Sequence, residues 1–157
     1  MELLKEIYLD TNMIHGWFRN FMASTKNSQL LKIPSVLEFL IGKDLALFTT
    51  TLTKIEIFRY IRSEWGLDEK FCNEVWDTFI KSFNITSIEV EQVELGELLN
   101  LVSKVSTRKK TLVNLMHLQL AKKNGLWFLT GEENLKERYA EYYDKVLTYQ
   151  NLRKLFG

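Results

Sequence analysis

The sequence predicts an α/β fold, a three-layer α/β/α sandwich around a five-stranded parallel sheet. Five short apolar or β-branched segments alternate with segments of helical periodicity. Such alternation implies parallel strands joined by right-handed crossovers, with helices on both faces of the sheet. With 157 residues, 46% of them hydrophobic, the chain is long enough for one sizeable core. We therefore expect a single domain over residues 1–157.

The expected strands are short and rich in aliphatic, aromatic or β-branched side chains. They span residues 7–9, 45–50, 85–90, 126–130 and 145–149. The last of them is expected at an edge of the sheet.

Apolar residues that recur every three or four positions predict the helices. The expected helices span residues 13–21, 34–41, 51–65, 68–83, 93–105, 111–123 and 132–143. In the fifth of them, five side chains are expected to face the core: Leu95, Leu98, Leu99, Val102 and Val105. The polar runs 23–29 and 106–110 predict loops, and 150–157 reads as a basic tail that carries leucines.

Composition limits the class of partner and the compartment. The net charge of +1 gives no global signal for a polyanion, so any nucleic-acid binding must come from local patches. The single Cys72 cannot form an internal disulfide, which favours a reducing, cytoplasmic compartment. No segment has the roughly 18 apolar residues of a membrane span, and the N-terminus lacks a signal-peptide layout.

Acidic residues follow three of the expected strands. Asp10 ends the first strand, Glu56 lies one turn into the helix after the second, and Glu132 and Glu133 follow the fourth. Ligand sites of open parallel sheets lie beyond the carboxyl ends of the strands. Carboxylates gathered there repel one another, and a hard divalent cation such as Mg²⁺ or Mn²⁺ relieves that repulsion. The pattern suggests metal-assisted phosphodiester chemistry.

Each acid also has a plainer interpretation. Asp10 suits the N-cap of the following helix. Glu56 could be solvated or could pair with Arg59 three residues later. Glu132 and Glu133 suit the first turn of a helix, where the dipole favours acids.

Four segments in this order resemble motifs of the PIN-domain ribonuclease family. Residues 7–12, Ile-Tyr-Leu-Asp-Thr-Asn, resemble that family's opening, a hydrophobic strand that ends in Asp-Thr-Asn. The segment 52–58 is similar to the part of the family that carries its second acid. Residues 114–121 have the spacing of its third motif, and residues 128–135 resemble its last.

The resemblance implies a fold, an activity and partners. It implies a parallel sheet of strand order 3-2-1-4-5 and a cluster of acids that binds Mg²⁺ or Mn²⁺. It also implies an endoribonuclease that hydrolyses RNA and leaves a 5′-phosphate and a 3′-hydroxyl. Many small members are the toxin of a toxin–antitoxin pair and often form dimers, so an antitoxin protein and a second copy of the chain are expected partners.

The resemblance also implies roles for individual residues. The expected catalytic and metal-binding residues are Asp10, Glu56, Asn114 and Glu132. The residues expected to support them by hydrogen bonds are Thr11, Asn12 and Thr130, with Glu133 as a reserve acid. The candidate phosphate contacts, which could equally be solvated cations, are Arg59, Arg108, Lys109 and Lys110.

Two positions depart from the family pattern. Asn114 stands where the family has its third Asp, and Glu132 stands where it has its fourth acid. An amide oxygen can ligate a hard cation but cannot supply a charge or act as a base. Asn114 and His117, on an otherwise apolar helix, could also be a satisfied core amide and a packed imidazole. The alternative function is therefore a PIN-like module that binds RNA or protein without cutting it.

Overall fold

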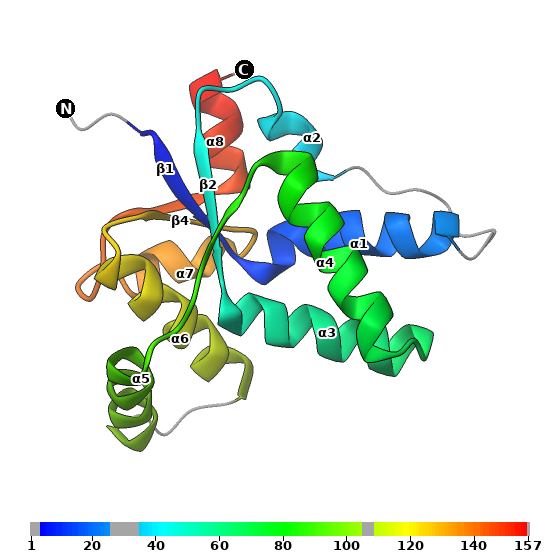
Figure 1. The fold of residues 1–157 in the computed structure, drawn as a ribbon. Helices are drawn as coiled ribbons and strands as arrows, with labels where there is room; N and C mark the ends of the chain where they lie inside the picture. The colour runs from blue at the N-terminus through cyan, green and yellow to red at the C-terminus, as the bar shows by residue number, and fades with distance from the viewer. Residues whose placement is uncertain (1–3, 26–34, 105–108, 157) are drawn as a thin grey trace.

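One parallel sheet organises the chain (Figure 1). A computed structural model describes residues 4–25, 35–104 and 109–156, without the side chains of 109 and 110. The sheet has the order β3-β2-β1-β4-β5, and its pairs are parallel. The strands are β1 Glu6–Leu9, β2 Ala46–Thr50, β3 Thr86–Ile88, β4 Trp127–Thr130 and β5 Val146–Thr148. Both the predicted fold class and the strand order are confirmed.

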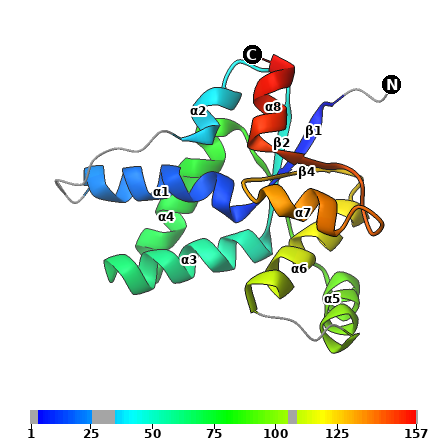
Figure 2. The ribbon, with the colours of Figure 1, turned by 180° about the vertical axis from the view of Figure 1, so that it is seen from behind.

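Helices cover both faces of this sheet. The helices are α1 Thr11–Thr25, α2 Val36–Leu40, α3 Thr51–Trp65, α4 Glu69–Phe83, α5 Gln92–Lys104, α6 Lys109–Lys123, α7 Glu133–Arg138 and α8 Tyr149–Phe156. In Figures 1 and 2, α1, α3 and α4 lie on one side of the strands and α5, α6 and α7 on the other. No helix in the described part of the chain is long and apolar enough to cross a membrane.

Strand alternation divides the hydrophobic core into two parts. Ile7 and Leu9 of β1 are fully buried on the face that α1, α3 and α4 cover. Tyr8, between them, is fully buried on the opposite face, against residues of α5, α6 and α7. Successive side chains of a strand point to opposite faces, so β1 contributes to both cores and is the centre of the molecule.

Local signals explain several element boundaries. The side chain of Asp68 accepts a hydrogen bond from the amide of Phe71 at 2.9 Å, which caps α4. The side chain of Ser35 caps α2 in the same way. Gly66, with φ of 67°, adopts the left-handed conformation that ends α3.

Three predictions of secondary structure need correction. Residues 149–156 form α8 directly after β5, where the sequence was interpreted as a tail. The helix predicted for 132–143 ends at Arg138, and turns follow. Part of each predicted loop is helical, because α1 continues to Thr25 and α6 begins at Lys109. The other residues of those loops lie mostly outside the described ranges.

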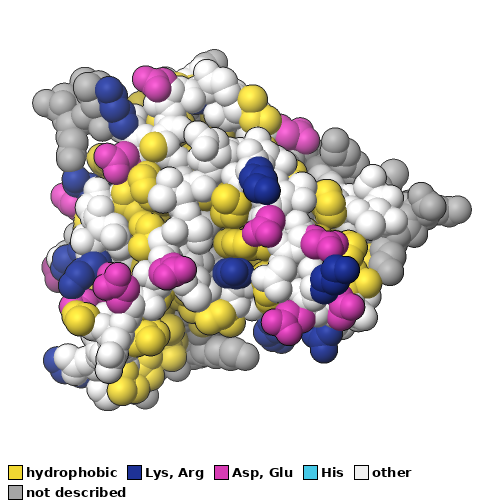
Figure 3. Space-filling model, viewed as in Figure 1, with side chains coloured by type: hydrophobic (Ala, Val, Ile, Leu, Met, Phe, Trp, Pro, Cys, Tyr) yellow, Lys and Arg dark blue, Asp and Glu magenta, His cyan; other side chains and the backbone are white. Residues whose placement is uncertain are grey.

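The prediction that five residues of α5 face the core is also wrong. Leu98 is buried, but Leu95 and Leu99 are 56% and 70% exposed. Val102 is half-buried, and Val105 lies outside the described residues. Figure 3 shows hydrophobic side chains gathered at the lower left, where α5 lies in Figure 1. The helix packs through a narrow face, so its apolar stripe is wider than its contact.

A substitution at Phe79 tests the packing of the larger core, the one on the face that α1, α3 and α4 cover. Phe79 is fully buried, and its ring centroid lies 4.8 Å from that of Phe18 and 5.4 Å from that of Trp76. We expect Phe79→Ala to lower the free energy of unfolding by about 3–5 kcal/mol, because it leaves a cavity in a packed cluster. Urea denaturation measures the loss, with the exposed Phe156→Ala as control at about 0.5 kcal/mol or less. Equal losses in the two variants would contradict this account of the core.

Candidate active site at the carboxyl edge of the sheet

Asp10 marks the point where β1 ends and α1 begins. Its amide donates to the carbonyl oxygen of Leu129 at 2.9 Å, which continues the ladder between β1 and β4. Its carboxylate oxygen Oδ2 accepts a hydrogen bond from Thr130 Oγ1 at 2.8 Å. Only 3% of the residue is exposed. Asp10 is therefore a buried acid held by the neighbouring strand, and its side chain does more than begin a helix.

The surroundings of Asp10 oppose its negative charge. Burial raises the pKa of its carboxyl above the ordinary value, and the nearby Glu56 and Glu132 raise it further. His117 and the hydrogen bond from Thr130 act in the opposite direction. Three carboxyl groups are thus close enough for their charges to interact, as expected of acids that meet at one sheet edge.

Glu56 reaches the same edge from α3, which begins directly after β2. Ile57 is fully buried and Ile55 is 61% exposed, so Glu56 lies between the core and the solvent. Its carboxylate oxygen Oε1 accepts a hydrogen bond from Thr11 Oγ1 at 2.9 Å. The same oxygen is hydrogen-bonded to His117 Nε2. Glu56 therefore pairs with a histidine of α6, and the alternative pairing with Arg59 is not needed to explain it.

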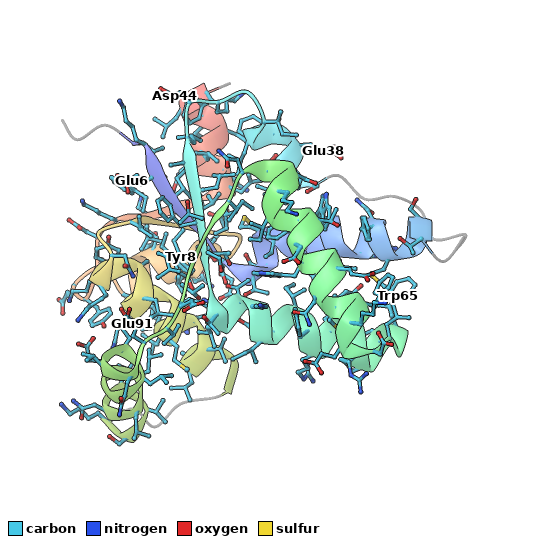
Figure 4. The ribbon with its side chains drawn as sticks, viewed as in Figure 1. Glu6, Tyr8, Glu38, Asp44, Trp65 and Glu91 are labelled. Atoms are coloured by element: carbon cyan, nitrogen blue, oxygen red, sulfur yellow. The ribbon has the colours of Figure 1, made fainter. Side chains whose placement is uncertain are left out.

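A chain of hydrogen bonds extends from Glu56 into the core. His117, fully buried, places Nδ1 2.6 Å from the hydroxyl of Tyr8, which lies 2.8 Å from Thr50 Oγ1. Figure 4 shows Tyr8 in the centre of the molecule. An ionised carboxylate only accepts, so His117 Nε2 is the donor toward Glu56. Burial raises the pKa of the Tyr8 hydroxyl well above its ordinary value, so this hydroxyl keeps its proton.

Glu132 and Asn114 form the third part of the site. Glu132 lies at the N-cap position of α7 without capping it by its side chain. Its Oε2 accepts a hydrogen bond from Asn114 Nδ2 at 2.9 Å. Nearby, Asn12 Oδ1 accepts from the amide of Gly131 at 3.2 Å, which joins the start of α1 to the turn before α7.

These side chains line one cleft of about 660 Å³. Its lining residues are Asp10, Thr11, Asn12, His15, Glu56, Val113, Asn114 and Glu132. All four residues proposed from the sequence as catalytic therefore lie at one place. Thr130 does not line the cleft but donates a hydrogen bond to Asp10, which does. Glu133 is exposed on α7 and is not among the lining residues.

The donors of this cleft suit a hard cation by their chemistry, because they are carboxylate and amide oxygens. In the described part of the chain, however, no group of three or more His, Cys, Asp and Glu side chains is arranged to hold a metal ion. Each acid is instead held by a protein donor: Asp10 by Thr130, Glu56 by His117 and Glu132 by Asn114. The carboxylate and amide oxygens of the cleft are therefore suitable metal ligands by their chemistry, but these side chains would have to rotate to bind the same ion.

The candidate phosphate contacts separate into two groups. Arg59 is exposed on α3 and lines a second cleft beside the first. Arg108 lies outside the described residues. Lys109 and Lys110 begin α6, and their side chains also lie outside the described part.

His117 was not among the predicted site residues, because a buried histidine on an apolar helix is more often a packed imidazole than a ligand. The residue is packed, but it also contacts a proposed catalytic acid. A signal was present, because His117 follows Asn114 by three positions and therefore lies on the same face of α6. Its partners Glu56 and Tyr8 lie 61 and 109 positions away, which no local pattern connects.

Fold and site together define an α/β protein with an acid-lined cleft at the carboxyl edge of a parallel sheet. No protein-family model matches the chain, and no curated protein matches it. Among solved structures, the chain is similar to a chain of VapBC2 from Rickettsia felis bound to a DNA fragment from the promoter. The identity is 14% and the TM-score 0.47, over 91% of this chain and 96% of that chain.

The hydrogen-bonded chain behind Glu56 can be tested through Tyr8. We expect Tyr8→Phe to lower the free energy of unfolding by about 1–3 kcal/mol, because His117 Nδ1 and Thr50 Oγ1 both lose a buried partner. Urea denaturation measures this loss. The control is Tyr142→Phe, which removes a half-buried hydroxyl 3.3 Å from Gln119 Oε1 and should cost less than about 1 kcal/mol. A smaller loss for Tyr8→Phe than for the control would contradict the network.

The pKa of Asp10 predicts a pH-dependent stability. Because its folded-state pKa is raised, the ionised carboxylate destabilises the fold as pH rises above the ordinary carboxyl value. In the absence of added metal, Asp10→Asn should therefore unfold at a higher temperature than the wild type at pH 7. The difference should shrink as pH falls toward the ordinary carboxyl value, because a growing fraction of the wild-type carboxyl is then protonated. Calorimetry at several pH values measures it, with the exposed Asp77→Asn on α4 as control; a less stable Asp10→Asn at pH 7 would refute the assignment.

Proposed function

We propose that this chain is a metal-dependent endoribonuclease of the PIN-domain kind, which hydrolyses RNA phosphodiester bonds. One observation carries the proposal: three carboxylates from separate segments, Asp10, Glu56 and Glu132, line one cleft with the amide of Asn114. Oxygen ligands of this kind select Mg²⁺ or Mn²⁺. The resemblance of four sequence segments to PIN-domain motifs supports the same activity.

The residues of the cleft would have different roles in binding the metal and orienting the attacking water. Asp10 and Glu56 would hold the metal directly, and Asn114 would do so through its amide oxygen or a water. Glu132 would bind a second metal or orient the attacking water. When bound, the metal would neutralise charge on the phosphoryl group and activate water. Thr11 and Thr130 keep two of the acids oriented by hydrogen bonds.

The substrate and partners are finer parts of the proposal. Arg59, exposed beside the acid cleft, is the described candidate for a phosphate contact. The motif resemblance further supports the toxin of a toxin–antitoxin pair, with an antitoxin protein and a second copy as partners. A small gene immediately upstream of the coding sequence would support that assignment.

A second candidate is a PIN-like module that binds RNA or protein without cutting. The observation that favours it is the hydrogen bond from Asn114 Nδ2 to Glu132 Oε2. A neutral donor occupies the place where a further acid would add charge to the site. Metal binding therefore decides between the two candidates.

The deciding experiment combines calorimetric titration with Mn²⁺ and cleavage of a mixed-sequence RNA. Wild type should bind Mn²⁺ and cleave, whereas Asp10→Asn should do neither while keeping its circular dichroism spectrum. Asn114→Asp should bind Mn²⁺ about tenfold more tightly, because it adds a charged ligand. It should also unfold at a lower temperature than wild type until Mn²⁺ is added, since its new carboxylate faces that of Glu132.

The matched control is Glu137→Gln, which removes an exposed carboxylate of α7 away from the cleft. It should bind Mn²⁺ and cleave as wild type does. If folded wild type takes up no Mn²⁺ and cleaves no RNA, the enzyme proposal fails and the second candidate replaces it.

A further inference from the structure

A second cleft adjoins the cleft that holds the acids. It has a volume of about 490 Å³ and shares four lining residues with the first: Thr11, His15, Glu56 and Val113. The two clefts therefore meet at Glu56. A ligand whose reacting group lies at the acids would place its neighbouring part in the second cleft.

Two aromatic rings line this second cleft. His15 of α1 and Tyr60 of α3 are both half-buried, with centroids 4.2 Å apart and planes inclined by 56°. Trp65 Nε1 donates a hydrogen bond to the Tyr60 hydroxyl at 3.0 Å. Trp65, which is labelled in Figure 4, is the last residue of α3 and packs against the larger core. The Tyr60 ring is therefore held in place before any ligand arrives, which lowers the entropy lost on binding.

The charges of the second cleft favour a neutral planar group inside it. Burial lowers the pKa of the His15 imidazole, Arg19 lowers it further, and Glu64 acts in the opposite direction. Burial and Arg19 therefore favour the uncharged form of the His15 imidazole. Glu64 and Glu56 also line the cleft, and their carboxylates would repel a phosphate that entered it. A nucleobase meets no such repulsion. It is uncharged and flat, and its amino groups can donate hydrogen bonds to a carboxylate.

We propose that the second cleft binds one unpaired nucleobase of a single-stranded RNA by stacking on Tyr60, beside the phosphate that lies at the acids. The inference rests on the proposed function for its substrate class. The exposed Arg59 of the same cleft is placed to contact the flanking phosphate. A base within a duplex is covered on both faces, so the subsite selects single strands or unpaired loops.

The test measures binding by fluorescence anisotropy, with calcium present and the integrity of the RNA checked on gels. One probe is a labelled, unstructured single strand of about twelve nucleotides, within the span that such binding sites cover. The other has the same backbone with abasic residues. Tyr60→Ala should weaken binding of the first probe by about tenfold or more, the range found for a lost base–aromatic stack. It should leave the abasic probe unaffected.

Variants separate stacking from folding. Tyr60→Phe keeps the ring but loses the hydrogen bond from Trp65, so it should bind less tightly than wild type and more tightly than Tyr60→Ala. Tyr60→Leu keeps apolar volume without a flat ring and should lose affinity like Tyr60→Ala. Tyr60→Leu also serves if the alanine variant fails to fold. The exposed Phe156→Ala on α8 is the control and should bind like wild type.

The outcomes distinguish this inference from the proposed function. Unchanged affinity in folded Tyr60→Leu, or an equal loss on the abasic probe, overturns the subsite even if wild type cleaves RNA with Mn²⁺. Binding that depends on Tyr60 without any cleavage supports the subsite and overturns the nuclease. A folded wild-type protein that binds neither probe overturns the subsite, and one that also takes up no Mn²⁺ and cleaves no RNA overturns both.

Discussion

The hydrogen bond between His117 and Glu56 connects the two halves of this molecule. Glu56 belongs to α3, which packs on one face of the sheet, and His117 belongs to α6, which packs on the other. Their side chains meet beyond the carboxyl edge, and Tyr8 ties His117 back to the central strand. Burying an imidazole or a carboxylate without a partner is costly. His117 is fully buried and needs its hydrogen-bond partners, whereas Glu56 is partly exposed and is also held by Thr11, so these contacts together set the geometry of the acid cleft.

The same edge holds charge that the fold alone does not require. Asp10 is almost completely buried, and both burial and its neighbours Glu56 and Glu132 oppose its ionisation. A sequence selected only for stability would place a neutral side chain there, as stabilising substitutions at functional sites commonly show. The cost is consistent with a cleft prepared in advance for a cation or another electron-poor ligand.

A central strand such as β1 was predictable because a buried parallel strand is a short apolar run, and Ile7 and Leu9 are fully buried. The helix α8 was missed because it has 8 residues and buries only Leu152, so it shows no apolar repeat long enough to identify a helix. For α5, the leucine spacing correctly predicted a helix, but Leu95 and Leu99 are exposed. Periodicity reports which side chains share a face, whereas burial depends on which other element packs there. That second fact is a property of the tertiary structure.

The acids of the site were predictable from their positions after strands, but their partners were not. Asn114 and His117, one turn apart on α6, each lie against an acid from another element: Glu132 before α7 and Glu56 on α3. The helix thus presents a face of hydrogen-bond donors that holds two same-charged groups apart. Among the described residues no three-ligand metal group is formed, and the two acids are each engaged by a donor of α6. A cation bound in the proposed way would have to compete with these donors, and the amide of Asn114 would have to turn its oxygen inward.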